Sequence, residues 1–373
     1  MIRSKSDCGK MFPLRTFLAL FYNSRILLNM KLIFITLLSL LLYSCSEEES
    51  SVQVSEKMLG VCLVAPPKKF SQDPMPDITK VGSGWVAVVP YSYTSKGKAE
   101  LHFNTDSQWW GERQEGIEES VKLAKGAGLQ VLLKPHVWVR GSWVGALDYS
   151  SSKEWEAWES DYYDYIMFNA RLASSMKVEA LCVGTELKIS VQKREAFWRK
   201  LIKDVREVYS GRLLYAANWD EYPLVPFWDD LDYIGVDAYF PLSQEKTPSI
   251  ETLKKEWEPV VKSLQEFSSK QNRPIVFSEF GYLSLDGCTH NTWALEKKRK
   301  ETPINELAQA NAYEALFEVF WEKKWWAGGL LWKWYPDYNK DNPRRAYYYA
   351  GDYTPQEKES EVVIRKWYTK EDN

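Results

Sequence analysis

Eight short apolar segments, separated by stretches with helical periodicity, constrain the fold of this 373-residue chain more than any other feature. The segments span residues 58–64, 85–91, 129–136, 179–185, 212–218, 231–239, 273–279 and 327–334. Near-continuous runs of apolar and β-branched residues are typical of parallel strands that are buried on both faces. Strand and helix alternating eight times predict a (β/α)8 TIM barrel.

The segments between these strands carry apolar residues at helical spacing and charged residues on the outer face. We expect helices over residues 112–127, 153–176, 192–209, 249–270 and 304–324. A doubly wound sheet is the alternative, but no G-x-G-x-x-G sequence follows the first strand. Because no repeat or low-complexity linker divides the chain, we expect residues 58–373 to form one domain.

The N-terminal region has the pattern of a secretory signal. Met30 and Lys31 precede an apolar run over residues 32–42, which is too short to span a membrane. We therefore expect residues 1–44 to be removed, and residues 1–29 to lie upstream of the true start at Met30. One long membrane anchor is the alternative, although Arg25 and Asn29 interrupt it.

The end of the apolar run resembles a bacterial lipobox, with the sequence Leu42-Tyr43-Ser44-Cys45. This resemblance implies that Cys45 is lipidated and anchors the protein to the bacterial cell envelope, at a surface-exposed site on the outer membrane. The acidic residues 46–49 resemble the export tag of surface lipoproteins in Bacteroidetes-like bacteria. We expect residues 45–57 to be a flexible tether, because they are polar and acidic.

Charge and cysteine content narrow the range of partners. Loss of residues 1–44 removes six basic residues and one acidic residue, so the net charge moves from −3 to about −8. An acidic chain without a basic run is not expected to bind nucleic acid, and membrane contact is expected only through the lipid. We expect Cys62 and Cys182 to be buried thiols. With Cys288, the remaining cysteines are three in number and lack paired spacing, so they suggest neither a zinc site nor a disulfide framework.

Two of the predicted strands end in a glutamate. Glu186 closes the sequence LCVGTEL, and Glu279 lies in PIVFSEFGY. In a (β/α)8 barrel the carboxyl ends of all strands open on one face, so these side chains are expected to meet. Two carboxylates placed in this way can cleave a glycosidic bond, one as proton donor and one as nucleophile or base. The alternative is that both are ordinary exposed glutamates among the 51 acidic residues of the chain.

Further candidates lie at the ends of neighbouring strands. Tyr239 could hydrogen-bond Glu279 and keep it ionised, or it could serve only in packing. Asp237 is expected to be a buried, hydrogen-bonded carboxylate. On the third strand, Lys134 and His136 fall on one face by the period of two. His136 is either a structural histidine or a ligand of sugar hydroxyls.

The chain is rich in aromatic residues, with 18 Trp, 22 Tyr and 15 Phe. Aromatic faces stack on the apolar faces of sugar rings, although core packing would also use them. Trp138 is a candidate for a sugar subsite, and Tyr91 is a weaker one. Trp332 and Trp334 are expected to share one face of the eighth strand.

Five motifs together resemble glycoside hydrolase family 113. They are KPHVW at 134–138, VGTEL at 183–187, GVDAYFPL at 235–242, SEFGY at 278–282 and GGLLWKWYPD at 328–337. The resemblance covers most of residues 58–340. It implies a (β/α)8 fold and a retaining endo-β-1,4-mannanase, with Glu186 as the acid/base, Glu279 as the nucleophile and a tryptophan such as Trp332 beneath the sugar being cleaved.

One position departs from the wider clan to which that family belongs. Most related families have asparagine before the acid/base, where its amide binds the 2-hydroxyl of the sugar, but here the residue is Thr185. The resemblance then implies that another residue makes this contact. Asn218, Lys134 and His136 are the candidates.

The sequence as a whole predicts a monomeric retaining glycoside hydrolase that cleaves mannan or glucomannan, as polysaccharide or oligosaccharide. The reaction requires no cofactor and no metal ion. Two alternatives stay open. The protein could be a non-catalytic, glycan-binding surface lipoprotein, or a hydrolase of the same clan that acts on another β-glycan.

Overall fold

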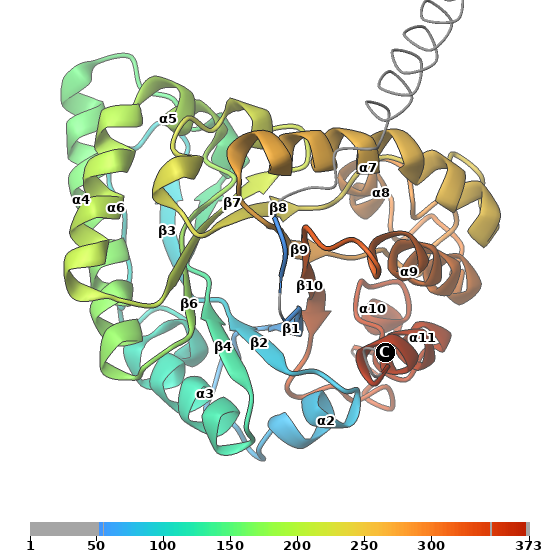
Figure 1. Ribbon diagram of the computed structural model, residues 1–373. Coiled ribbons are helices and arrows are strands. Elements are labelled where there is room, and N and C mark those ends of the chain that lie inside the picture. The colour runs from blue at the N-terminus through green and yellow to red at the C-terminus, as the bar shows by residue number, and fades with distance from the viewer. Residues whose placement is uncertain (1–51, 55, 344, 371–373) are drawn as a thin grey trace, which may run out of the picture. The chain divides into compact units, whose positions relative to one another are not determined.

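In the computed structural model, eight parallel strands close into a barrel, and helices surround it (Figure 1). The structure describes residues 52–54, 56–343 and 345–370. Each barrel strand pairs with the next one along the chain, and the last closes on the first. The strands are β1 (Met58–Leu63), β2 (Trp85–Val88), β4 (Gln130–Leu133), β6 (Ala180–Thr185), β7 (Arg212–Asn218), β8 (Tyr233–Asp237), β9 (Ile275–Phe280) and β10 (Trp326–Trp334). The predicted (β/α)8 barrel and its eight strands are therefore confirmed.

Two of the barrel strands end earlier than the sequence suggests. β2 stops at Val88 and β4 at Leu133, and each is followed two residues later by a proline, Pro90 and Pro135. Proline lacks the backbone N–H that hydrogen bonding between neighbouring strands needs, so both segments leave the barrel there. They then form a separate parallel pair, β3 (Tyr91–Ser95) with β5 (His136–Arg140).

The helices of the described chain are α2 (Met75–Lys80), α3 (Gln114–Gly126), α4 (Ser152–Ser175), α5 (Lys188–Lys193), α6 (Glu195–Val208), α7 (Ile250–Gln271), α8 (Thr292–Lys297), α9 (Glu306–Phe320), α10 (Ala346–Ala350) and α11 (Glu359–Tyr368). All five predicted helices are present, but the one expected over 192–209 is α6, preceded by the separate α5. The helices α2, α8, α10 and α11 have no counterpart among the predicted segments.

Side chains of the loops fix where the long helices begin. Ser151 Oγ accepts a hydrogen bond from the Glu154 N–H, and the Glu154 carboxylate accepts one from the Ser151 N–H, so a capping box starts α4. Ser249 caps α7, and Asn305 caps α9. These caps satisfy N–H groups that the first turn of a helix leaves without partners.

The core has two layers, as the alternation of side chains along each strand requires. One layer fills the barrel and includes Cys62, Leu132, Cys182 and Val276. The larger layer lies between the strands and the helices. Cys62, Cys182 and Cys288 are buried free thiols, which confirms the expectation for the first two.

The predicted export segment 1–44 and the lipidation site Cys45 lie outside the described residues. Within the tether expected over 45–57, Val52 and Val54 pack against the barrel domain. Val52 is 6% exposed and belongs to the core, while the Val54 N–H donates to the Lys324 carbonyl at 3.0 Å. These valines are apolar residues in a polar stretch, and their burial holds this segment against the domain. Within the described ranges, no helix combines the length and apolar character needed to cross a membrane.

Candidate active site

Glu186 and Glu279 lie at the same end of the barrel. Glu186 directly follows β6, and Glu279 is the penultimate residue of β9. All neighbouring barrel strands are parallel, so their carboxyl ends open on one face. Burial and the charge on Glu279 both raise the pKa of Glu186.

A buried lysine holds the Glu279 carboxylate. The Lys134 ammonium is fully buried and donates to Glu279 Oε1 at 2.6 Å, to Asp237 Oδ1 at 3.0 Å and to the Ser278 carbonyl at 3.3 Å. These bonds use all three protons of the ammonium group. Burial opposes the charge on Lys134, but Asp237 and Glu279 outweigh it and raise the pKa of Lys134.

Two further side chains complete the surroundings of Glu279. Tyr239 donates its hydroxyl to Glu279 Oε2 at 2.8 Å, which confirms the predicted hydrogen bond. His136 Nε2 lies 3.3 Å from Glu279 Oε1. Burial raises the pKa of Glu279, but Lys134, His136 and the hydrogen bonds outweigh it and lower that pKa to about 2. Glu279 is therefore ionised at neutral pH.

Asp237 competes with Glu279 for the same cation. It is fully buried, as predicted, and its Oδ1 accepts hydrogen bonds from Lys134 and from the Ser278 hydroxyl at 2.8 Å. Burial and the charge on Glu279 raise the pKa of Asp237 well above its usual value. One lysine cannot neutralise two buried carboxylates, so the negative charge concentrates on Glu279, which has the additional donors.

The pKa of Glu186 is shifted in the opposite direction from that of Glu279. Burial and the charge on Glu279 raise its pKa to about 7, although the Trp143 indole N–H donates to Glu186 Oε2 at 2.9 Å and acts in the other direction. At neutral pH and below, much of this carboxyl keeps its proton. Glu186 also has a φ of +53°, a left-handed conformation that costs a non-glycine residue about 1–3 kcal/mol.

Trp143 reaches Glu186 from the loop after β5. The loop continues as a single 3-10 turn over Val144–Ala146, and the indole lies against Gly145. A Cβ at Gly145 would come within 2.2 Å of the Trp143 ring, so only glycine lets the indole occupy this position. Nothing in the sequence distinguishes Trp143 from the other tryptophans, because loop geometry carries no periodic signal.

The aromatic residues predicted to bind sugar differ in exposure and in the rings that they contact. Trp332 is partly buried and stacks on His136, with 5.9 Å between ring centroids and 3° between planes. Trp138 is 58% exposed at the open end, and Trp143 is 43% exposed. Tyr91 packs edge-on against His136 at 5.1 Å. Trp332 and Tyr91 thus both pack against His136, which lies beside Glu279, and Trp138 packs edge-on against Tyr91 at 6.5 Å.

The prediction that Trp332 and Trp334 share a face is wrong. A register shift in the pairing of β10 with β1 breaks the alternation between Leu331 and Trp334. Trp334 turns into the layer between barrel and helices and is 3% exposed. It has no surface on which a sugar could stack.

The three candidates for contact with the sugar 2-hydroxyl differ in burial and in the hydrogen bonds that they already make. Lys134 is ruled out, because it is fully buried and all its protons are used. Asn218 is partly exposed; its amide donates to Asp220 at 3.2 Å, and its oxygen accepts from the Trp219 N–H. His136 keeps a 12% exposed side chain, and burial lowers its pKa, so its ring is neutral at pH 7. Asn218 and His136 stay the candidates.

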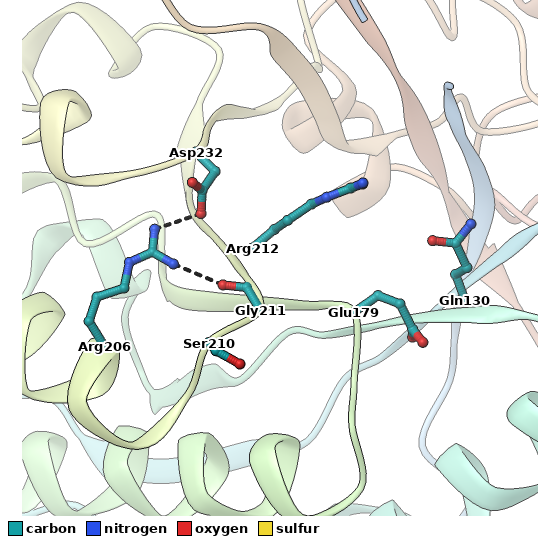
Figure 2. A pocket seen from close by; sticks show the side chains of 7 residues that line it. All are labelled: Gln130, Glu179, Arg206, Ser210, Gly211, Arg212 and Asp232. Atoms are coloured by element: carbon teal, nitrogen blue, oxygen red, sulfur yellow. Dashed lines mark hydrogen bonds and ion pairs between the residues drawn. The ribbon is translucent and has the colours of Figure 1, made fainter. Parts of the chain in front are cut away.

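A hollow lies at the opposite end of the barrel, where the strands begin (Figure 2). Arg206 donates to Asp232 at 2.6 Å and to the Gly211 carbonyl at 2.8 Å, as Figure 2 shows. Glu179 accepts from Lys125 and from the Val131 N–H. In (β/α)8 barrels this end serves stability. We therefore place the chemistry at the end that carries Glu186 and Glu279.

The fold and the site define a class of protein. A (β/α)8 barrel whose open end pairs an ionised carboxylate with a carboxyl of raised pKa is the arrangement of a glycoside hydrolase. Comparison with known sequences agrees, since the model of glycoside hydrolase family 113 matches residues 67–354. That match covers well over half of the chain, and the protein belongs to this family.

Solved structures support the assignment. The chain is 26% identical to the family 113 β-mannanase of Alicyclobacillus acidocaldarius, solved in complex with ManMIm, with a TM-score of 0.73 over 84% of this chain and 97% of that one. A second family 113 β-1,4-mannanase is 25% identical, with a TM-score of 0.71 over 85% of this chain and all of the other. A β-glucuronidase from Ruminococcus gnavus, 13% identical with a TM-score of 0.55, shares the fold and is matched over 50% of its length. None of the curated proteins matches this chain.

Proposed function

We propose that this glycoside hydrolase is a retaining β-mannanase that cleaves internal β-1,4 bonds of mannan or glucomannan. The observation that carries the proposal is the contrast in hydrogen bonds to the two glutamates: the Lys134 ammonium and the Tyr239 hydroxyl donate to Glu279, whereas the neutral Trp143 indole donates to Glu186. Glu279, with a pKa of about 2, and Glu186, with a pKa of about 7, hold between them one negative charge and one proton near pH 5–6. Those are the states that a nucleophile and a proton donor need before the first step.

In the first step, Glu279 attacks the anomeric carbon while Glu186 gives its proton to the departing glycosidic oxygen. The bond to the leaving sugar breaks, and a glycosyl ester forms on Glu279. Glu186, now a carboxylate, takes a proton from water, and the hydroxide oxygen attacks the same carbon from the opposite side. The ester breaks, the sugar leaves with its original configuration, and both carboxyl groups return to their starting states.

The pKa of Glu186 supports this cycle in both directions. While Glu279 is negative, its charge favours the protonated form of Glu186. Once Glu279 is esterified that charge is gone, so Glu186 loses its proton more readily and can act as a base. Lys134 meanwhile keeps Glu279 a stable leaving group by favouring the carboxylate.

The preference for mannan is supported by the two family 113 β-mannanases that the chain resembles. The exposed faces of Trp138 and Trp143 suit a sugar chain that crosses the open end of the barrel. Trp332 would form the floor beneath the sugar that is cleaved. Asn218 and His136 are the residues proposed to contact hydroxyl groups of the substrate.

Two measurements test the proposal together. Reducing-sugar release across mannan, glucomannan, galactomannan, xylan and cellulose identifies the substrate, and proton NMR of the first products gives the anomer. We expect release from the mannans and initial formation of the β-anomer. Release from xylan or cellulose alone would favour a hydrolase of another β-glycan. Binding without release from any of them would favour a glycan-binding protein.

We also propose that the enzyme is a lipid-anchored protein of the bacterial envelope. Support for this comes from the sequence alone, from the apolar run 32–42 and the lipobox-like residues that end at Cys45. An anchor at Cys45 would leave the barrel free to meet a polysaccharide outside the cell.

A further inference from the structure

Glu221 is a buried carboxyl that the proposed reaction does not use. It lies in the loop after β7, has no exposed surface, and is bonded by neutral groups: the Tyr215 hydroxyl at 2.9 Å and the Asn218 N–H at 3.3 Å. Burial raises its pKa to about 7. A buried carboxyl with neutral partners is unfavourable for stability, so its position calls for another explanation.

Tyr215 connects Glu221 to the residue after the proton donor. The Tyr215 oxygen accepts a hydrogen bond from the Leu187 N–H at 2.7 Å. The same hydroxyl has one proton, which it gives to Glu221 Oε1. With Glu221 as acceptor, the hydroxyl must turn its lone pairs toward Leu187, so the carboxyl determines the direction of both bonds.

Two hydrogen bonds to β7, one from the Leu187 N–H and one from the Glu186 N–H, hold the turn that carries Glu186. This residue has a φ of +53°, and its own N–H donates to the Ala216 carbonyl at 2.8 Å. Adjacent residues of β7, Tyr215 and Ala216, therefore bind the N–H groups on both sides of the Glu186 α-carbon. A left-handed glutamate persists only where its surroundings fix it, and these bonds do so.

The side chain of Tyr215 is held in place by its packing. It is fully buried, and its ring packs edge-on against Trp198 at 5.5 Å and Phe227 at 5.7 Å. Because the ring is held in place, the Tyr215 hydroxyl keeps a fixed position between Glu221 and the Leu187 N–H. The connection runs from the β7 loop through a rigid side chain to the turn after β6.

We propose that Glu221 is a positioning residue for the proton donor, acting through Tyr215 to hold Glu186 where it reaches the glycosidic oxygen. The inference rests on the proposed function, because it assigns proton donation to Glu186. Glu221 does not touch the substrate. Its loss should therefore impair only those steps in which Glu186 transfers a proton.

The test compares Glu221→Leu, Glu221→Gln and Tyr215→Phe with wild type on aryl β-mannosides of graded leaving-group acidity. We expect Glu221→Leu and Tyr215→Phe to lower kcat/KM at least about tenfold for phenyl mannoside, since general acid catalysis contributes about 10²–10⁴-fold. For a dinitrophenyl mannoside, which leaves without a proton, kcat/KM should stay within about threefold of wild type. Glu221→Gln keeps an acceptor for Tyr215 and should restore most of the phenyl mannoside activity.

Glu112→Leu is the matched control. Glu112 is 5% exposed and accepts a hydrogen bond from the hydroxyl of the partly buried Tyr93 at 2.7 Å, so the two form a second Glu–Tyr pair, and no hydrogen bond joins Glu112 to either catalytic candidate. Equal losses on both mannosides in Glu221→Leu, or the same profile in Glu112→Leu, would overturn the proposal. Wild-type leaving-group dependence in Tyr215→Phe would also overturn it. If wild type releases no reducing sugar from any mannan, the proposed function fails, which is a separate outcome.

Discussion

Replacing Lys134 with methionine is the most informative single change in the catalytic site. Methionine has a similar length and keeps the packing, but it removes the charge that bonds Glu279 at 2.6 Å and Asp237 at 3.0 Å. Two buried carboxyl groups then face each other without a cation. The variant should bind a proton on Glu279 at a pH where the wild type keeps that carboxyl ionised.

The structure gives the size of the effect. The pKa of Glu279 is lowered from 4.5 to about 2, which at 1.36 kcal/mol per pKa unit corresponds to about 3 kcal/mol in favour of the carboxylate. Breaking a buried ion pair by removal of one partner costs about 3–5 kcal/mol. We therefore expect a loss of about 3–5 kcal/mol in the free energy of unfolding at pH 7.

The same change should reshape the dependence of activity on pH. A rise in the pKa of Glu279 protonates the nucleophile at low pH, so the acid limb of kcat/KM moves up into the measurable range. The assay is kcat/KM on an aryl mannoside between pH 3 and pH 9, with urea unfolding at pH 7. Lys125→Met is the control, because Lys125 bonds Glu179 in a partly exposed pair, which is worth about 0–1 kcal/mol. An unchanged acid limb together with unchanged stability would refute the role of Lys134.

Four further outcomes follow from the site. With Glu186 at a pKa of about 7 and needed as the acid, kcat/KM of wild type should fall as pH rises through about 7; a profile flat to pH 9 would contradict this. Trp143→Phe removes a donor to the charged form of Glu186, so that limb should move upward, and a downward shift in a pH titration would count against the bond. Glu279→Ala with azide should give the α-mannosyl azide and Glu186→Ala the β-azide, and NMR showing the reverse would exchange their roles. Cys45→Ala should release the protein from membranes with full activity, whereas continued membrane association on fractionation would argue for a retained N-terminal helix.

The barrel and the glutamates were predictable because their signals are local and periodic. Each buried parallel strand is a continuous apolar run, and Glu186 and Glu279 come directly at the ends of two such runs. The Tyr239–Glu279 bond was predictable for the same reason, since Tyr239 comes two residues after the end of the strand that pairs with β9. Knowledge of the barrel was enough to bring these residues together.

Other parts of the site depend on geometry that the periodicity of the sequence does not predict. The shift in β10 that buries Trp334 is visible only in the pairing register. Lys134 falls on the predicted strand, but its full burial follows from two acidic partners more than 100 residues away. The Trp143 contact with Glu186 arises from a loop, where sequence patterns are weakest.

The most direct test of the account is to trap the glycosyl-enzyme. A 2-deoxy-2-fluoro mannosyl fluoride forms the ester quickly and hydrolyses it slowly, because fluorine destabilises both transition states while fluoride leaves readily. Intact-mass measurement should show one added fluoromannosyl group, and peptide mapping should place it on Glu279. Inactivation with the label on another residue, or steady turnover of mannan with no label at all, would contradict the account.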